Sequence, residues 1–578
     1  MLVAWGQFAQ CIGLVDKIQA ISIRQKTVDH SPQSKVLEFL VANLAGLAHL
    51  KEISLSAHPL DHDRVVAQAW GQAQWADYSG VSRTLSTLSG AETEAICRVL
   101  GEISAPFMEK EALLSFKQAG RLILDGDLSG RSVSDTSQTY PAVAFGHMDD
   151  RVRLGYQAAL VSLYSPTYGR LWLSVKQHPG DTVSCTEAEP MVRRSEAILG
   201  LRPLRRVELL QKRLEKLEKD GAGFKEAQEK ARQSLADAQR KLEETQQLVL
   251  VWLEKVQASE ALYLEKQRPI RPHSQVAQSR KKLLAYQKRQ ERRAASVTRA
   301  ERRLSRIENE RQAWERLVAQ LRKRLEEFEQ DNRTNSAPVP MLFRLDAGFG
   351  TPENIALLIE MGYEVYSKPH GNWLNSRLSH WVKDPAAWQR VGKNAEMVAW
   401  PAVSLSDFPY PLDLALERFH TGEQLRMGAL IHFGQDLAAS QLITWFERYN
   451  QRQEIEAGNK EEKQVFELHH LKVRSPSGIC LQEQFVAFAA NFVRWATIWM
   501  TQDCPNLPDG WFDPDQFHIK EQVKVGAKAL AWVSWYEQGC LLRFEEYSVF
   551  AGKSLNIQKH WTFQPVLPFA KSCYFSRF

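Results

Sequence analysis

The spacing of apolar residues changes several times along the chain, and each change predicts a different kind of element. Residues 35–50 and 63–75 carry apolar side chains three and four positions apart, which is the spacing of a helix packed on one face. Residues 1–118 are therefore expected to form a helical domain. Residues 202–334 are almost wholly Glu, Lys, Arg, Gln, Ala and Leu, which predicts a long antiparallel helical hairpin. Its strong breaks are Gly221-Ala-Gly223 and Pro269-Ile-Arg-Pro272.

The two arms of this hairpin are expected to pack as a coiled coil. Apolar residues alternate three and four positions apart at Val207, Leu210, Leu214 and Leu217. A return arm of residues 275–333 would extend roughly 90 Å at about 1.5 Å per residue. This arm is rich in Lys and Arg, so it is either a solvated helix face or an arm that binds DNA or a second subunit.

Short apolar runs that end in acidic residues predict buried strands on either side of the hairpin. One run, at 121–129, carries Asp125 and Asp127, and the other, at 338–346, ends at Asp346. Side chains alternate across a strand, so Asp125 and Asp127 are expected on one face. Strands that deliver carboxylates to the edge of a sheet are typical of a site that binds a cation.

Further strands and helices are expected around these two. Residues 155–164 and 170–176 predict an antiparallel pair joined by a tight turn. After the second acidic strand, Thr351 predicts the start of a helix, and residues 363–368 predict the strand that follows it. Residues 372–435 end in two alternating runs, which predict a small β-rich insertion. The chain is therefore expected to belong to the α/β class.

Composition narrows the compartment and the partners. A net charge of +6 permits a polyanionic partner such as DNA without requiring one. The seven cysteines lie far apart with no C-x-x-C pair, which argues against a zinc site and a disulfide framework and favours a reducing cytoplasm. The apolar stretch 485–500 is interrupted by Asn491 and Arg494 and is too short to span a bilayer, so it is expected to be a core helix. The N-terminus does not resemble a signal peptide.

Four functional side chains recur at fixed offsets in residues 449–463. Arg452, Glu456 and Lys463 follow Tyr449 at offsets of three, seven and fourteen, which would gather all four on one stripe of a single helix. A carboxylate flanked by a phenol, a guanidinium and an ammonium suits a metal ion held against a phosphodiester. The pattern resembles the Tyr-Arg-Glu-Lys signature of bacterial insertion-sequence transposases of the DDE class. The sequence R-L-D-A-G-F-G that contains Asp346 resembles the second catalytic aspartate region of the same group.

The resemblance implies a ribonuclease H-like mixed-sheet core with a triad of metal-binding, catalytic carboxylates. Asp346 and Glu456 would supply two of them. Asp127 is favoured as the third because Leu and Ser129 follow it, while Asp125, which directly ends the apolar strand, stays open. Such oxygen ligands suit Mg²⁺ or Mn²⁺, and phosphoryl transfer uses two ions about 4 Å apart. The residues expected to bind DNA phosphates are Tyr449, Arg452 and Lys463.

The resemblance also divides the chain into seven expected segments. Within the first, residues 78–89 are similar to a helix-turn-helix entrance in which Arg83 contacts DNA, or else form a loop that caps a packed helix. The segments are a helical N-terminal DNA-binding domain at 1–118, the first part of the core at 119–201, the coiled-coil hairpin at 202–334, the second part of the core at 335–371, the β-rich insertion at 372–435, the third part of the core with the signature helix at 436–502, and a C-terminal module at 503–578 with strands at 528–535 and 540–550.

By this resemblance the protein is an enzyme that cleaves DNA at transposon ends and joins them to target DNA. Its partners would be double-stranded DNA and a second copy of the chain, because pairing two ends requires at least a dimer, and it would act in the bacterial cytoplasm at the nucleoid. Two alternatives stay open. One is a metal-dependent nuclease without transposition, and the other is a catalytically silent, domesticated DNA-binding or scaffold protein built around the coiled coil.

Overall fold

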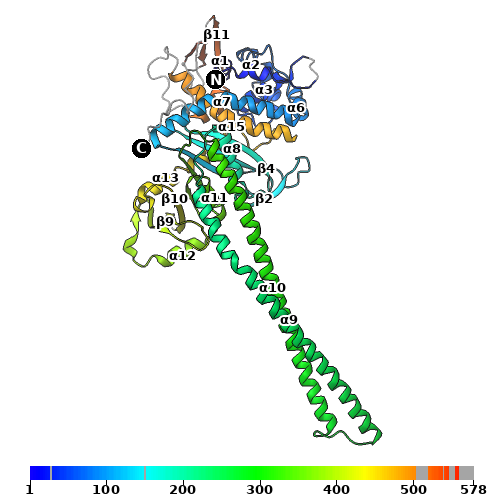
Figure 1. Ribbon diagram of the computed structural model, residues 1–578. Helices are drawn as coiled ribbons and strands as arrows, with labels where there is room; N and C mark the ends of the chain where they lie inside the picture. The colour runs from blue at the N-terminus through cyan, green and yellow to red at the C-terminus, as the bar shows by residue number, and fades with distance from the viewer. Residues whose placement is uncertain are drawn as a thin grey trace. The chain divides into compact units, whose positions relative to one another are not determined.

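The computed structural model describes residues 1–25, 29–148, 151–422, 424–502, 518–537, 539–545 and 554–558 (Figure 1). The chain divides into two compact units, Met1–Leu204 with Asn335–Phe578, and Arg205–Thr334. Each unit has buried apolar residues of its own.

Ten of the described strands of the first unit form one mixed sheet. Its order is β2-β3-β1-β5-β6-β10-β9-β8-β7, and β4 also pairs with β3. The central strands β1, β5 and β6 are parallel neighbours, whereas β3 is antiparallel to both β1 and β4. The bounds are β1 (Leu122–Ser132), β2 (Ala144–Met148), β3 (Arg151–Ser165), β4 (Gly169–Pro179), β5 (Met341–Leu345), β6 (Glu364–Ser367), β7 (Gln389–Arg390), β8 (Ala395–Val403), β9 (Leu412–Thr421) and β10 (Gln424–Phe433).

The sequence predicted most of these strands but not all of their neighbours. The four runs expected before and after the hairpin are β1, β3, β4 and β5, and residues 363–368 contain β6. The insertion expected at 372–435 does consist largely of strands, but β10 pairs antiparallel with β6, so these strands extend the main sheet. Alternation along a strand reveals its two faces and not its partner, and the edge of β6 offers backbone groups that β10 satisfies.

Helices of the first unit pack on the strands around β1. Helices α7, α8 and α15 contact β1, β3 or β4. Phe107 of α7 stacks on Trp495 of α15 with ring centroids 4.3 Å apart, and the Asn491 side chain bonds both the backbone N–H and the C=O of Trp172 at 2.8 Å. The core helix expected at 485–500 is therefore confirmed within α15, and none of the described helices is long and apolar enough to cross a membrane. The bounds are α7 (Gly90–Ala119), α8 (Ser184–Leu199), α11 (Pro352–Glu360), α12 (Trp373–Trp381) and α15 (Pro476–Gln502).

The N-terminal region is helical, as expected, with shorter helices. The two predicted helices end at Leu44 and Ala69, because Gly46 and Gly71 adopt left-handed φ angles of 60° and 68° that terminate a helix. Residues 78–87 form a helix and not a loop, and the next helix starts at a capping box between Ser89 and Glu92. The expected DNA contact of this region stays a prediction. The bounds are α1 (Leu2–Cys11), α2 (Leu14–Gln19), α3 (Pro32–Leu44), α4 (Glu52–Leu55), α5 (Arg64–Ala69) and α6 (Tyr78–Thr87).

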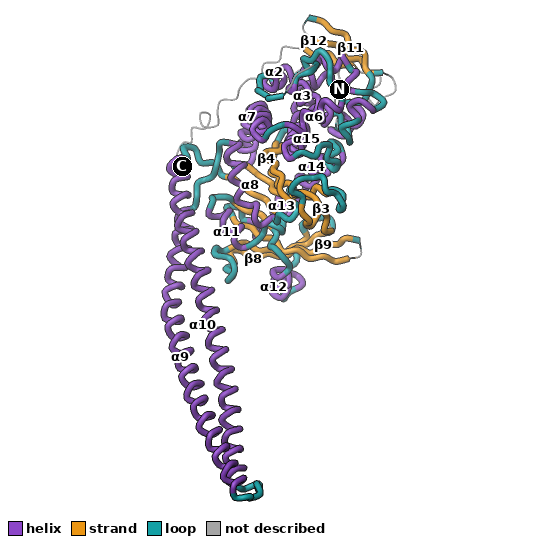
Figure 2. Tube along the Cα trace, turned by 90° about the vertical axis from the view of Figure 1, so that its right-hand side faces the viewer, coloured by secondary structure: helices purple, strands orange, loops and turns teal. Residues whose placement is uncertain are grey.

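The second unit is an antiparallel pair of long helices, α9 (Val207–Glu265) and α10 (Gln275–Thr334), shown in Figure 2. The break expected at residues 221–223 is wrong, because α9 continues through it. Gly221 lies against the ring of Trp314, where an added Cβ would come within 2.0 Å, and the Trp314 indole N–H donates to the C=O of Leu217 at 2.8 Å. This glycine therefore allows close helix contact. Many exposed cations of α10 pair with acids one turn away, as Arg306 does with Glu310.

The described part of the C-terminal segment contains short helices and a small sheet. The helices are α16 (Ile519–Glu521) and the π-helical turn η4 (Gln522–Gly526). The sheet has the order β11-β12-β13, with bounds Ala531–Tyr536, Gly539–Phe544 and Ser554–Gln558. Both strands predicted at 528–535 and 540–550 are therefore present in part, and residues 546–550 lie outside the described residues. Free cysteines among the described residues are Cys11, Cys97, Cys185, Cys480 and Cys540.

Candidate active site

The segment that carries the four-residue signature is not one helix. A short turn, η3 (Ala438–Ser440), leads into α13 (Leu442–Asn450), and α14 (Gln453–Gln464) follows after a break. At the break the chain tightens, because Arg452 N–H donates to Tyr449 C=O at 3.1 Å and Ile455 N–H donates to Arg452 C=O at 3.0 Å. The expected single stripe is therefore wrong. Tyr449 lies near the end of α13, Arg452 lies at the break, and Glu456 and Lys463 lie on α14.

The break turns the Arg452 guanidinium inward, where it meets three carboxylates. Its Nη2 lies 3.0 Å from Asp127 Oδ1 and 4.0 Å from Asp346 Oδ2, and its Nη1 lies 3.1 Å from Glu456 Oε1. Asp127 is on β1, Asp346 directly follows β5, and Glu456 is on the first turns of α14. Because β1 and β5 are parallel neighbours, the two aspartates emerge side by side. The three predicted acids are thus brought together around one cation.

Arg452 pairs with acids in the structure, while the phosphate contact that the resemblance implied for it stays a prediction. Its side chain is buried, so its charge faces these acids and not solvent. The enclosed carboxylate of Asp127 beside it explains this orientation, since a carboxylate with little access to solvent needs a cation or hydrogen-bond donors. The neighbouring carboxylates hold the pKa of Arg452 above its usual value despite its burial, so it stays charged.

Asp127 is the most enclosed of the three acids. Its side chain is 14% exposed, compared with 37% for Asp346 and 54% for Glu456. Asn459, one turn after Glu456 on α14, donates from its amide to Asp127 Oδ2 at 2.5 Å. Burial, together with the charges of the nearby acids, raises the pKa of Asp127 to about 6. The positive charge of Arg452 acts in the opposite direction and lowers this pKa. Asp346 and Glu456 are therefore accessible to solvent, whereas Asp127 is enclosed and accepts a hydrogen bond from Asn459.

Asp125, the other candidate for the first ligand, is engaged elsewhere. Both of its oxygens accept from Arg344 of β5, at 2.6 Å from Nε and 2.8 Å from Nη2. Arg344 also donates to the C=O of Arg448 at 2.7 Å, which joins this ion pair to α13. Both side chains of the pair are almost fully buried. This geometry favours Asp127 as the ligand and gives Asp125 a role in joining β1, β5 and α13.

A second buried ion network fixes α14 against the sheet. Arg131 of β1 donates to Glu462 of α14 at 2.9 Å, to Glu483 of α15 at 3.0 Å and to the hydroxyl of Ser129 at 2.8 Å. One guanidinium thus serves two buried carboxylates, and burial raises the pKa of Glu462 to about 8. Glu456 therefore belongs to a helix that the ion pairs of Arg131 hold against the sheet.

Glycine in α14 allows a close contact with the sheet. An added Cβ at Gly458 would lie 2.4 Å from Nε of Arg170 and 2.7 Å from the ring of Trp172. Both residues belong to β4, so α14 packs closely on that strand through this position.

The two remaining signature residues lie in different surroundings. Tyr449 is buried, its hydroxyl donates to the C=O of Leu345 at 3.5 Å, and Lys368 Nζ lies 5.4 Å from the centre of its ring. Burial raises the pKa of Tyr449 above its usual value, so it stays a neutral phenol. Lys463, in contrast, lines an open cleft. The signature is therefore divided between a buried support and a surface cation.

A cleft of about 830 Å³ opens beside the carboxylates. Asp127 and Glu456 line it, and cationic or imidazole side chains line it too. Those residues are Lys460, Lys463, His147 and His370. A negatively charged centre bordered by cations can hold a divalent metal and the phosphate that it activates. The donors around Arg452 are all oxygens, which fit Mg²⁺ or Mn²⁺.

Two groups of described side chains, neither of which contains Asp127, Asp346 or Glu456, have potential metal-ligating atoms within 4.8 Å of one another. One is Glu467, His469 and His470. The other is Glu364, His432 and Asp436, whose acids are already neutralised, Glu364 by Arg121 and Asp436 by Arg121 and Arg448. The second group therefore belongs to a buried ion network, whereas the first contains two neighbouring imidazoles.

Sequence reasoning found the three acids but missed their partners. Asn459 had a usable signal, since a position three residues after Glu456 lies on the same helix face. Arg344 and Arg131 had none, because the residues that they pair with are set by strand register and by packing of distant helices. Comparison with models of protein families and with curated proteins found no match to this chain.

Proposed function

We propose that this protein is a DDE-class DNA transposase with a ribonuclease H-like core. One observation carries the proposal: Asp127, Asp346 and Glu456, from three elements far apart in the sequence, converge on one guanidinium beside a cation-lined cleft. These are the acids that the resemblance named, in the order and structural settings that it implied. A coincidental helix face would not bring Glu456 to Asp127 on β1 and to Asp346 directly after β5.

The sheet supports the proposed core. Strands β4, β3, β1, β5 and β6 are successive neighbours, with β1, β5 and β6 parallel and β3 antiparallel to β1. The acids lie on or directly after the two central parallel strands, and a helix supplies the third. The pair α9 and α10 would be a coiled-coil insertion into this core, and Mg²⁺ or Mn²⁺ its cofactor.

The proposed chemistry has two steps of phosphoryl transfer. Water attacks the phosphodiester at the transposon end and releases a 3′-hydroxyl, which then attacks a phosphodiester of target DNA and expels its 3′-oxygen. The metal ions, when bound by Asp127, Asp346 and Glu456, would stabilise charge on the attacking and leaving oxygens. Lys460 and Lys463 would hold phosphate oxygens in the cleft. Arg452 would keep the three acids assembled, and Tyr449 would support the end of β5.

The test compares Mg²⁺-dependent cleavage and strand transfer by the full chain on a labelled duplex that carries the gene's own flanking ends. Glu456→Gln is expected to lower both by at least about 100-fold while end binding persists, because a ligand is lost without loss of shape. Glu454→Gln, an exposed acid two residues earlier on α14, is the matched control and should cut normally. If the wild type does not cut although it is folded and binds the ends, the silent DNA-binding protein is the better account.

The long helix pair could serve DNA or a second subunit, and removing it would test both roles. Replacing residues 223–330 by a short linker should weaken end binding or reduce the oligomer size. Unchanged end binding with an unchanged oligomer would contradict both roles and leave α9 and α10 as a solvated appendage. Cleavage without strand transfer in the intact chain would instead favour the nuclease.

A further inference from the structure

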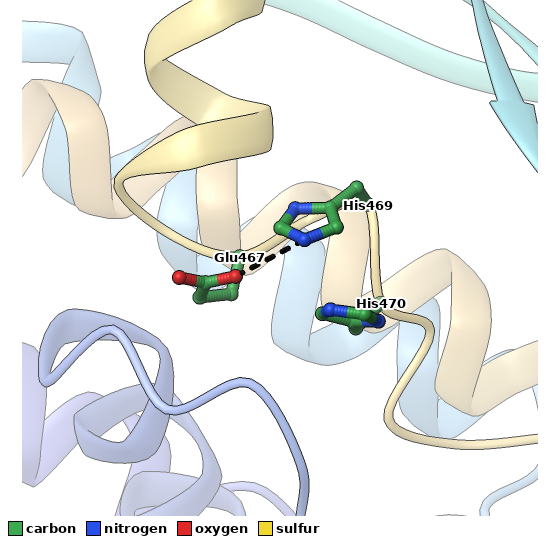
Figure 3. A group of neighbouring side chains, drawn as sticks. All are labelled: Glu467, His469 and His470. Atoms are coloured by element: carbon green, nitrogen blue, oxygen red, sulfur yellow. Dashed lines mark ion pairs between the residues drawn. The ribbon is translucent and has the colours of Figure 1, made fainter.

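A cluster of imidazoles follows α14, outside the carboxylate site (Figure 3). One potential ligand atom from each of Glu467, His469 and His470 lies within 4.8 Å of the others. The rings of His469 and His470 have centroids 4.0 Å apart, and the ring of His49 lies 4.9 Å from that of His470. His49 belongs to the segment between α3 and α4. Three imidazoles and a carboxylate therefore meet from two distant parts of the chain.

The hydrogen bonds of His469 prepare one of its nitrogens to bind a cation. Its Nδ1 contacts the C=O of Lys463, so this nitrogen carries the proton and donates it. In the neutral ring, Nε2 then presents a lone pair, and this atom lies 3.3 Å from Glu467 Oε2 (Figure 3). Two acceptors face each other at that distance only if a proton or a metal ion joins them. A backbone carbonyl behind the ring is a common support of metal-bound histidine.

The backbone of Glu467 has an uncommon conformation that sets the direction of its side chain. Its φ is 56°, a left-handed conformation that residues with a side chain rarely adopt. Phe466 and Leu468 on either side are fully buried, so packing holds the turn in place. Lys524 contacts the Oε1 atom of Glu467, which leaves Oε2 directed at His469. This conformation thus presents one carboxylate oxygen to the imidazoles.

We propose that Glu467, His469 and His470, with His49 as a fourth ligand, bind a divalent transition metal of the zinc class. Imidazole nitrogens with one carboxylate suit Zn²⁺, whereas the all-oxygen site around Arg452 suits Mg²⁺. Four-coordinate zinc needs ligand distances of about 2.0–2.2 Å, which small side-chain rotations would supply. The ion would join the segment after α14 to the segment between α3 and α4. The proposal is independent of transposase activity.

The competing explanation is an ion pair between a protonated His469 and Glu467. The two differ in what happens when metal is added at neutral pH. A metal site takes up one equivalent of Zn²⁺ through at least two imidazoles, while an ion pair takes up none. Binding would also raise the unfolding temperature in proportion to the logarithm of the metal concentration.

The experiment uses chelator-treated, full-length Glu456→Gln protein, so that the carboxylate site contributes less. Isothermal titration with Zn²⁺ is expected to show one equivalent bound. His469→Ala and His470→Ala should each weaken it more than about 10-fold, and His49→Phe should weaken it less because the other three ligands remain. His273→Ala, in the exposed loop between α9 and α10, is the control and should bind normally. Unchanged binding in both His469→Ala and His470→Ala would overturn the proposal.

A variant could also lose zinc because it does not fold, so a second measurement uses the protein without histidine substitutions. X-ray absorption at the zinc edge of the loaded protein should show imidazole scattering from at least two rings. A site of oxygen ligands alone, or absence of stoichiometric binding in the folded protein, would equally refute the imidazole site. The cleavage assay plays no part in these readouts, so this result and the test of transposition stand apart.

Discussion

Asp125 and Asp127 lie two residues apart on β1, yet their carboxylates lie in opposite electrostatic settings. Asp125 has a guanidinium to itself, since Arg344 binds both of its oxygens. Asp127 shares the guanidinium of Arg452 with Asp346 and Glu456, and so belongs to a group with more negative than positive charge. The first arrangement is neutral and closed, and the second is anionic and borders a cleft.

The difference shows how one strand can carry a structural acid and a ligand acid. A bidentate pair satisfies the carboxylate completely, so a metal ion would have to break two charge-assisted hydrogen bonds to reach it. A shared guanidinium leaves surplus charge that a dication can neutralise. The number of acids per buried cation, and not the spacing on the strand, therefore decides which aspartate is available.

The largest expected effect comes from breaking the closed pair. Asp125→Asn leaves the Arg344 guanidinium buried without its counter-charge, which is expected to cost about 3–5 kcal/mol of unfolding free energy. Urea unfolding at neutral pH measures this loss. Asp127→Asn is the comparison, and its cost should be clearly smaller because it removes one acid from a group with surplus negative charge. Equal costs in the two variants would contradict the distinction.

The reverse pattern is expected for chemistry. Asp127→Asn should lower Mg²⁺-dependent DNA cleavage by at least about 100-fold, since a ligand to the metal is lost. Asp125→Asn, assayed at a temperature where it is folded, should retain cleavage within a few-fold. Rates per folded molecule, with the folded fraction from circular dichroism, make the comparison. Loss of cleavage in Asp125→Asn but not in Asp127→Asn would show that Asp125 is the metal ligand and would contradict the assignment to Asp127.

A smaller effect concerns pH and the network that positions α14. Glu462 shares Arg131 with Glu483, and its pKa is raised to about 8. Its protonated form therefore favours the folded state fully below the unfolded pKa of about 4.5, and this contribution is lost as the pH rises through about 8. Unfolding free energy should therefore fall across that window. Glu462→Gln, which mimics the protonated acid, should flatten the profile, and an unchanged slope would refute the assignment.

The sequence carried the acids because each has a local signature. An apolar run that ends in Asp predicts a strand and its exit. Asp346 does directly follow β5, whereas Asp127 lies inside β1, which continues to Ser132. The two long helices could also be predicted from the sequence, because residues that favour helices continue over many turns of α9 and α10. The strands of 412–418 and 424–432 were found too, but their pairing with β6 depends on a partner that is distant in sequence.

The break between α13 and α14 could not be read in the same way. Offsets of three and seven fit one continuous helix as well as two helices joined by a tight turn. Arg452 lies at the break, where its charge meets the acids of two strands. The sequence did not predict the imidazole cluster for a related reason: only the fold brings His49 to His470. Tertiary electrostatics thus decided what periodicity left open.

The place where the chain leaves the sheet for α9 and returns from α10 has a consequence for the gene. The Asn335 amide donates to the C=O of Arg202 at 3.1 Å, and Val339 N–H donates to the same oxygen at 3.1 Å. Departure and return therefore meet at one point, although residues 205–334 lie between them. A block of DNA that encodes this segment can be gained, lost or exchanged in frame without altering a single strand neighbour. The segment of α9 and α10 therefore resembles an exchangeable insertion, whose sequence can change without a matching change in the strands of the sheet.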